Sequence, residues 1–148
     1  MTLNEALIRQ TFIIHLIVKD DKSELSKDLK VKIMNMRVVL NRLRAEFEDA
    51  CVKKIEELQS EEFKELAQIQ NKSSEEESRF QLSLDKLNAD YDDFVTTKGL
   101  SQVSFDGKFT WEEYEDIIEV NAGINPEIDG KILNALDFLE IIYNLFVE

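Results

Sequence analysis

Proline, glycine, cysteine and histidine are all scarce in this chain, and each shortage excludes a class of structure or site. The 148 residues include one proline, four glycines, one cysteine and one histidine. A single cysteine cannot form an intrachain disulfide, and one cysteine with one histidine cannot build a zinc site from several such ligands. Because so few residues break helices, most of the chain favours long helical segments.

The lone cysteine and the lone histidine are interpreted as structural residues. No partner histidine lies near Cys51 in the sequence, so we interpret Cys51 as a small buried hydrophobe rather than a reactive thiol. His15 lies within an apolar run, which favours a core or interface residue over a metal ligand. Neither residue predicts a catalytic or metal site.

Long hydrophobic runs are missing as well. The run TFIIHLIV at residues 11–18 is far shorter than the roughly 20 residues that a bilayer-spanning helix requires. Glu5 precedes this run and KDDK follows it, which does not fit a signal peptide. We therefore expect a protein that is not secreted and makes no membrane contact, located in the cytoplasm or inside an assembled particle.

Catalytic signatures are also lacking. The sequence contains no glycine-rich phosphate loop, no dinucleotide fingerprint, no HExxH and no nucleophile elbow. Its many carboxylates lie where solvated helix faces are expected, and helical carboxylate metal sites usually include a Glu-x-x-His that this chain lacks. The sequence therefore predicts a non-enzymatic protein without a cofactor.

Charge, in contrast, is abundant and unevenly distributed. The chain has 31 acidic and 18 basic residues, and its formal net charge is −13. Residues 99–148 hold 11 acidic and 2 basic residues, whereas residues 19–44 hold 8 basic and 4 acidic residues. Most of this surface would repel duplex nucleic acid, so direct duplex binding is not expected. We interpret the basic segment as neutralising the acidic third of this chain or of a neighbouring copy, with another anionic partner as the alternative.

The first apolar segment has a clear beginning and an ambiguous end. Thr2 and Glu5 have capping-box spacing, which predicts that a helix begins there. Residues 11–18 are β-branched and apolar on nearly every side, so they fit either a continued buried helix, which we favour, or a strand. A polar loop follows, in which Ser23 or Ser26 is expected to cap the next helix.

The middle of the chain carries two apolar stripes with heptad spacing. The first predicts a helix that extends to about Ile69, and the second follows a capping box at Ser74 and Glu77. We therefore predict a coiled-coil-like antiparallel hairpin whose long arm needs cover from the N-terminal segment or from another subunit. The first stripe starts with Leu29, Ile33, Met36, Leu40, Leu43 and Phe47, and the second comprises Phe80, Leu84, Leu87, Tyr91 and Phe94.

The last third of the chain contains all four glycines and the proline. Two Asp-Gly pairs, Asp106–Gly107 and Asp129–Gly130, are flanked by short apolar runs, which predicts two β-hairpins with type I′ turns. Thr110 with Glu113, and then Asn134, are predicted to cap the helix that follows each hairpin. The expected structure is a small acidic α+β cap made of two such units.

The stretch DGKFTWEEY has a second interpretation, because it resembles the second half of an EF-hand calcium loop. In that alternative, Asp106, Thr110 and Glu113 would be calcium ligands. Gln102 stands where such loops carry their first carboxylate, and the next Asp-Gly pair follows too closely for an entering helix to fit. We therefore prefer a turn followed by a helix cap.

Residues 135–148, ALDFLEIIYNLFVE, are predicted to form a final helix that is apolar on more than one face. Phe138, Ile142 and Phe146 lie on one face, while Leu136 and Tyr143 lie on others. Few polar positions remain. The helix must therefore be deeply buried or docked on a partner.

These features predict a mainly α fold, with a hydrophobic helix and polar loop in residues 1–22, the hairpin in 23–98 and the acidic α+β cap in 99–148. The expected function is a non-enzymatic structural or assembly subunit, for example of a phage-type particle, that binds protein partners as a homo-oligomer or in a larger assembly. An acidic inhibitor that mimics nucleic acid and a weak cation-responsive module are the alternatives. The residues expected at the oligomer or partner interface are Phe12, Ile13, Leu16, Leu29, Ile33, Met36, Leu40, Leu43, Phe47, Phe138, Ile142 and Phe146.

Overall fold

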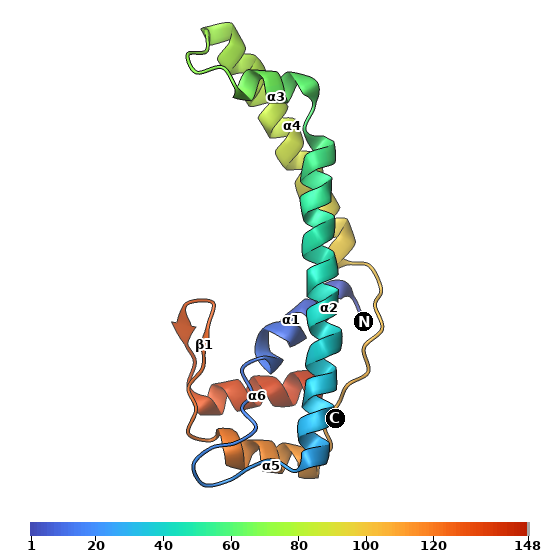
Figure 1. Ribbon diagram of the computed structural model, residues 1–148, viewed down its shortest axis with the longest axis vertical. Helices are drawn as coiled ribbons and strands as arrows, with labels where there is room; N and C mark the ends of the chain where they lie inside the picture. The colour runs from blue at the N-terminus through green and yellow to red at the C-terminus, as the bar shows by residue number, and fades with distance from the viewer. Residues whose placement is uncertain (148) are drawn as a thin grey trace. The chain divides into compact units, whose positions relative to one another are not determined.

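The computed structural model describes residues 1–147, which form six α-helices and one two-stranded antiparallel sheet (Figure 1). This confirms the predicted mainly α fold with a small α+β region near the C-terminal end. No helix in this part of the chain is long and apolar enough to cross a bilayer. The elements in chain order are α1 (Leu3–Ile13), α2 (Lys27–Leu58), α3 (Glu61–Ala67), α4 (Ser74–Gly99), α5 (Trp111–Asn121), β1 (Glu127–Ile128), β2 (Lys131–Ile132) and α6 (Ala135–Phe146).

The chain divides into two compact units, and α2 contributes residues to both. The first unit comprises Met1–Arg44 and the residues from Gln102 onward, and the second comprises Ala45–Ser101. This division crosses the predicted segments, because the N-terminal helix, the first half of α2 and the acidic C-terminal third belong to one unit.

Helix α1 begins where the sequence predicts and ends earlier than expected. The Thr2 hydroxyl accepts a hydrogen bond from Glu5 N (3.2 Å), and the Glu5 carboxylate accepts one from Thr2 N (2.7 Å). The helix ends at Ile13, so the prediction that the run TFIIHLIV is a continuous helix or a strand is wrong. The physical reason lies in α2, because the Arg37 guanidinium donates to the carbonyls of Ile13 and Leu16 and holds the chain as it leaves α1.

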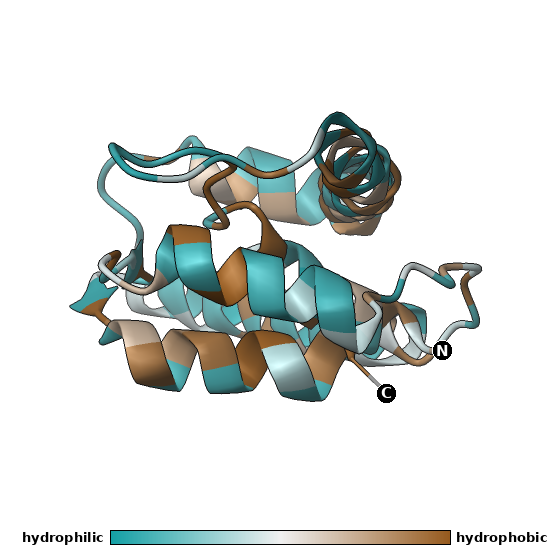
Figure 2. Cartoon of the chain, turned by 90° about the horizontal axis from the view of Figure 1, so that it is seen from below, coloured by the Kyte–Doolittle hydropathy of each residue, from teal (hydrophilic) through white to brown (hydrophobic). Residues whose placement is uncertain are grey.

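The core of the first unit is formed by residues of α1, the first half of α2, α5 and α6. Helix α6 packs against both α1 and α5. In Figure 2 it is the helix that ends beside the C label, and hydrophobic residues occupy much of its length. The core therefore joins segments from both ends of the sequence. Its most deeply buried side chains include Ile13, Ile33, Leu40, Ile117, Phe138, Ile142 and Phe146.

The second Asp-Gly pair forms the predicted hairpin. Asp129 and Gly130 have φ angles of 52° and 79°, in the left-handed region that a type I′ turn requires. Strand β1 pairs with β2 in a register that places Glu127 opposite Ile132. Asn134 then caps α6 as predicted, because its side-chain oxygen accepts a hydrogen bond from the backbone of α6.

The first Asp-Gly pair does not form a hairpin, so that prediction is wrong. The residues around Gly107 form an extended loop, and Phe109 N donates to Phe146 O (2.8 Å) instead of pairing across a turn. A Cβ atom on Gly107 would lie 2.8 Å from Met36 Cγ and 2.7 Å from Phe105 Cζ. Glycine is therefore required here because the loop passes close to α2, and its φ does not lie in the left-handed region.

The second unit is the helical hairpin, and its first arm is interrupted. Helix α2 ends at Leu58, earlier than predicted, and Ser60 caps the short helix α3 by accepting a hydrogen bond from Phe63 N (3.0 Å). Helix α4 returns beside α3 (Figure 1), where the stacked rings of Phe63 and Phe80 have centroids 5.4 Å apart. The chain folds back into a hairpin as predicted. The interruption of the first arm between α2 and α3 was not indicated by the apolar pattern.

Contacts between α2 and α4 close the rest of the hairpin. Cys51 is buried, as predicted, and the pKa of the Tyr91 hydroxyl on α4 is raised chiefly by the Cys51 side chain. The Lys54 ammonium lies 5.5 Å from the centroid of the Phe94 ring. Only the part of α2 from Ala45 onward belongs to this unit, so the arm that it forms with α3 is less unequal to α4 than the sequence suggested.

Candidate binding groove

The residues predicted to form an interface lie mostly inside the first unit. Phe12 and Leu43 are half-buried against the core, and Phe47 is half-buried in the second unit. The heptad face at the start of α2 is therefore covered within the chain, and these side chains offer little surface to a second subunit. The buried members of the predicted set are Ile13, Leu16, Leu29, Ile33, Met36, Leu40, Phe138, Ile142 and Phe146.

The calcium candidates of the alternative interpretation are arranged as a helix cap. Glu113 N donates to Thr110 Oγ1 (3.2 Å), and the Glu113 carboxylate accepts from Thr110 N (2.9 Å). Asp106 lies exposed in the loop that precedes α5. Among residues 1–147, no group of three His, Cys, Asp or Glu side chains is placed to hold a metal ion. The predicted capping box is confirmed.

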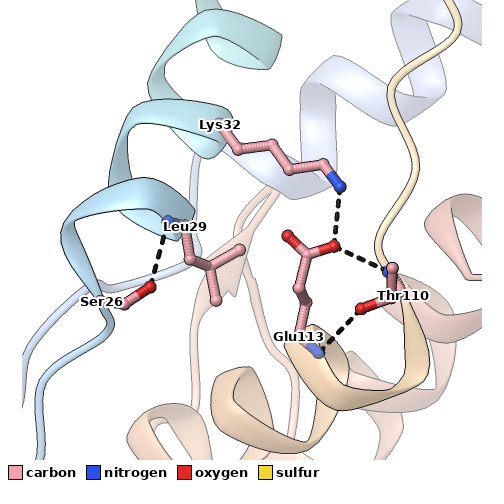
Figure 3. Close-up of polar contacts among 5 residues, drawn as sticks. All are labelled: Ser26, Leu29, Lys32, Thr110 and Glu113. Carbon is pink, nitrogen blue, oxygen red and sulfur yellow. Dashed lines mark hydrogen bonds and ion pairs between the residues drawn. The ribbon is translucent and has the colours of Figure 1, made fainter.

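This cap is also joined to α2 (Figure 3). Lys32 Nζ lies 2.7 Å from a Glu113 carboxylate oxygen, while Leu29 N donates to the Ser26 hydroxyl (3.2 Å) at the start of α2. Partial burial alone would raise the pKa of the Glu113 carboxyl. The hydrogen bonds from Lys32 and Thr110 outweigh burial, so the pKa lies below its ordinary value.

Helices α5 and α6 form an apolar groove with exposed aromatic side chains. Trp111, Leu136 and Tyr143 are 54%, 76% and 37% exposed. Large apolar side chains gathered at one exposed, concave place are typical of a binding site. The groove has a volume of about 390 Å³ and is lined by Trp111, Tyr114 and Ile118 of α5 and by Leu136, Leu139, Glu140 and Tyr143 of α6.

Tyr114 fixes the two walls of the groove relative to each other. It is buried on α5, and its hydroxyl donates to the Leu139 carbonyl of α6 (2.6 Å). The ring of Tyr143 lies 5.5 Å from that of Tyr114 and 6.2 Å from that of Trp111, measured between centroids. The aromatic side chains therefore support one another, and the groove exists before any partner arrives.

The groove has an acidic border. Helices α5 and α6 together carry seven acidic residues and no basic residue. Glu115 lies four residues after Trp111, on the same side of α5, and Glu140 lines the groove from α6. Burial raises the pKa of the Tyr114 hydroxyl, and the nearby Tyr143 and Glu140 raise it further, so Tyr114 remains a hydrogen-bond donor. The groove thus combines an apolar floor with negative charge at its edge.

A larger hollow beside α2 has a different character. It has a volume of about 620 Å³ and lies between α2 and the loop that contains Gly107. Its apolar lining includes Met36, which is buried, and Val39 and Phe105, which are half-buried. Its lining is as polar as it is apolar, whereas the lining of the groove between α5 and α6 is mostly apolar, so that groove is the stronger candidate for an apolar partner.

Part of this groove could be inferred from the sequence. The apolar residues of α6 were expected to cover more than one face, and Leu136 and Tyr143 are among those left over after the core is formed. The sequence does not indicate Trp111 and Tyr114 as groove residues, because nothing in the local pattern shows that α5 packs against α6. The one signal in the sequence that could have indicated Trp111 is its position directly after the predicted N-cap Thr110, at the start of a helix.

Comparison with protein-family models, with curated proteins and with solved structures finds no match to this chain. The interpretation of the groove therefore rests on its own residues.

Proposed function

We propose that this protein is a non-enzymatic binding subunit that docks a helical segment of another polypeptide in the groove between α5 and α6. In this role it would act as a structural or assembly component of a larger complex. The observation that carries the proposal is the exposure of Trp111, Leu136 and Tyr143 around one preformed apolar groove.

The side chains of the groove are suited to a protein partner. Fully burying a large apolar side chain contributes about 1.5–3 kcal/mol, and tryptophan and tyrosine are enriched among the residues that dominate binding energies. Tyr114 and Leu139 already join the two helices, so little ordering has to accompany binding. A groove of this kind fits the apolar face of an amphipathic helix.

The acidic border limits the choice of partner. Glu115 and Glu140 would attract a helix that carries lysine or arginine beside its apolar residues and would repel an acidic one. The acidic-mimic alternative relies on charge alone and predicts binding that salt abolishes. An apolar groove with a charged border predicts binding that salt weakens and does not abolish.

The test uses Trp111, which is the single tryptophan of the chain, as a fluorescent reporter. The probe is a designed amphipathic helical peptide of leucine and lysine, and its control has glutamate in place of lysine. We expect the leucine–lysine peptide to shift Trp111 emission to shorter wavelength in a saturable manner, because binding removes the indole from water. The glutamate peptide should have a much smaller effect.

A pair of substitutions provides the control. Leu136→Ser removes an exposed apolar side chain from the groove, and we expect it to weaken peptide binding by about tenfold or more. Ile132→Ser removes a side chain of similar exposure, 78% against 76%, from β2 outside the groove, and should leave binding unchanged. Equal weakening by both substitutions, or no response of Trp111 to the leucine–lysine peptide, would contradict the proposal. Binding that disappears in high salt and is insensitive to Leu136→Ser would favour the acidic-mimic alternative.

A further inference from the structure

A second exposed apolar surface lies on the first half of α2. Val31, Met34 and Val38 are 42%, 55% and 60% exposed. Their spacing of three and four residues places them along one side of the helix. The residues that α2 contributes to the core, such as Ile33 and Leu40, belong to a different side. We call Val31, Met34 and Val38 the α2 stripe.

The surroundings of the α2 stripe are basic. Residues 27–44 include six basic residues and one acidic residue. Lys27 lies four residues before Val31 and Arg42 four residues after Val38, so both continue the line of the stripe, and both are exposed. Two such stripes brought together would repel each other, which disfavours direct pairing of α2 with α2.

The stripe and the groove match in length and in charge. Val31 and Val38 are seven positions apart, and the same separation occurs along each wall of the groove, between Trp111 and Ile118 and between Leu136 and Tyr143. At 1.5 Å per residue each is about 10 Å long. The apolar helix face with basic ends is therefore complementary to the apolar groove with acidic borders.

From this match we propose that the groove of one copy receives the α2 stripe of a second copy of the same chain. The proposal rests on the proposed function and names the occupant of the same groove. Each copy carries one stripe and one groove, and these are different surfaces. The contact is therefore heterologous and produces either a closed ring, of which a pair is the smallest, or an open chain of copies.

The two surfaces are available for this contact. In a single chain the stripe and the groove residues Trp111 and Leu136 remain exposed, so no other part of the same chain covers them. Each contact buries a small area and belongs to the weak class of protein interfaces. Association should therefore depend on concentration, and salt should weaken it because the charges lie at the edge of the contact.

The test is a complementation experiment with two variants. Met34→Glu places a negative charge in the stripe, where it would face the acidic groove, and Leu136→Lys places a positive charge in the groove, where it would face the basic stripe. Sedimentation is measured for each protein from about 10 µM to 1 mM, a range that brackets weak dissociation constants. We expect wild type to self-associate and each variant alone to associate at least about tenfold more weakly.

The mixture of the two variants gives the decisive result. Leu136→Lys retains an intact stripe and Met34→Glu retains an intact groove, so an equimolar mixture should form a one-to-one dimer that neither variant forms alone. Ile132→Lys, which alters an exposed residue outside both surfaces, should behave like wild type. Circular dichroism of every variant verifies that the helical fold is retained.

Three results would overturn the proposal. They are a wild-type protein that remains monomeric over the whole range, self-association that neither substitution weakens, and a mixture that contains no dimer. The proposed function stands or falls separately, because it is judged by the response of Trp111 to the leucine–lysine peptide. A monomeric wild type that still binds this peptide would retain the groove as a binding site and exclude the second copy as its occupant.

Discussion

At the scale of single residues, Asn121 connects two segments that are far apart in the sequence. Its side-chain oxygen accepts a hydrogen bond from Ile17 N (2.9 Å), and its amide nitrogen donates to the carbonyls of Ile17 (3.1 Å) and Ile117 (2.9 Å). The side chain is fully buried. Asn121 thus binds both backbone groups of Ile17, as a neighbouring strand would, and holds the segment after α1 against the end of α5.

Replacing this side chain should destabilise the fold strongly. In Asn121→Ala the backbone groups of Ile17 lose their partner inside the protein, and we expect the free energy of unfolding to fall by about 2–4 kcal/mol. Chemical denaturation measures this change. The matched control is Asn144→Ala in α6, where the asparagine is exposed and alanine favours helix, so stability should be unchanged or slightly higher. Equal effects of the two substitutions would contradict the role assigned to Asn121.

The two Asp-Gly pairs show that one dipeptide can serve two purposes. At Gly130 the backbone adopts a positive φ, which a tight turn requires and which glycine accepts at little cost. At Gly107 the missing side chain leaves space for Met36 instead. The sequence alone cannot distinguish these cases, because Met36, one of the two side chains that approach Gly107, comes from a helix about 70 residues earlier.

At the scale of elements, helix starts were the most predictable features. The caps at Thr2, Thr110 and Asn134 lie where the sequence predicted them, because an N-cap depends only on residues up to three positions away. The cap of α4 is formed by Ser73 and Glu76, one residue earlier than predicted. Both registers have the required spacing in SSEEE, so local pattern could not choose between them.

The Glu113 cap gives a prediction that depends on pH. Glu113→Gln removes the ion pair with Lys32, and at neutral pH we expect the free energy of unfolding to fall by about 0.5–1.5 kcal/mol. The pKa of Glu113 is lowered in the fold, so its stabilising contribution is present above the ordinary pKa of 4.5 and is lost as pH falls through the lower folded value. The stability curves of wild type and variant should therefore converge in acid. Urea denaturation over a pH series measures this.

The control for this experiment is Glu119→Gln, which removes a carboxylate from an exposed position of the same helix. Its stability should differ little from that of wild type at neutral pH, because no ion pair to another element is lost. A Glu113→Gln variant whose deficit stays constant down to strongly acidic pH would show that Lys32 does not stabilise the charged carboxylate.

At the scale of the whole molecule, the buried hydrophobic residues are concentrated in one unit. Among the residues that the structure describes, 21 hydrophobic residues are buried, and two of them, Cys51 and Leu66, belong to the second unit. A helical hairpin with so little buried apolar surface has little tertiary stabilisation of its own. The two units should therefore differ in local stability.

Hydrogen exchange followed by mass spectrometry tests this difference. We expect amides of α3 and α4 to exchange markedly faster than those of α5 and α6, because local opening of the hairpin exposes little apolar surface. Amides in the first half of α2 should exchange more slowly than those near Leu58, although they belong to the same helix. Uniform protection along α2, or protection of α4 equal to that of α6, would contradict this prediction.

The sequence by itself determined the helical character of this protein, the position of most helix caps and the hairpin at Asp129–Gly130. These features follow from interactions between neighbouring residues, which the order of the amino acids specifies directly. Tertiary structure decided which apolar surfaces are covered. The heptad face of α2 that includes Leu29, Ile33 and Leu40 suggested a subunit interface, yet residues of α1, α5 and α6 pack on it.

The groove illustrates the same distinction. Its α6 wall was visible in the sequence as an excess of apolar residues, but its α5 wall depends on the contact between Tyr114 and Leu139, which lie 25 residues apart. Burial is a sum over contacts that the whole chain makes at once, and no local pattern contains that sum. The location of the exposed apolar surface, and therefore of the candidate site, depends on the packing of both ends of the chain in one core.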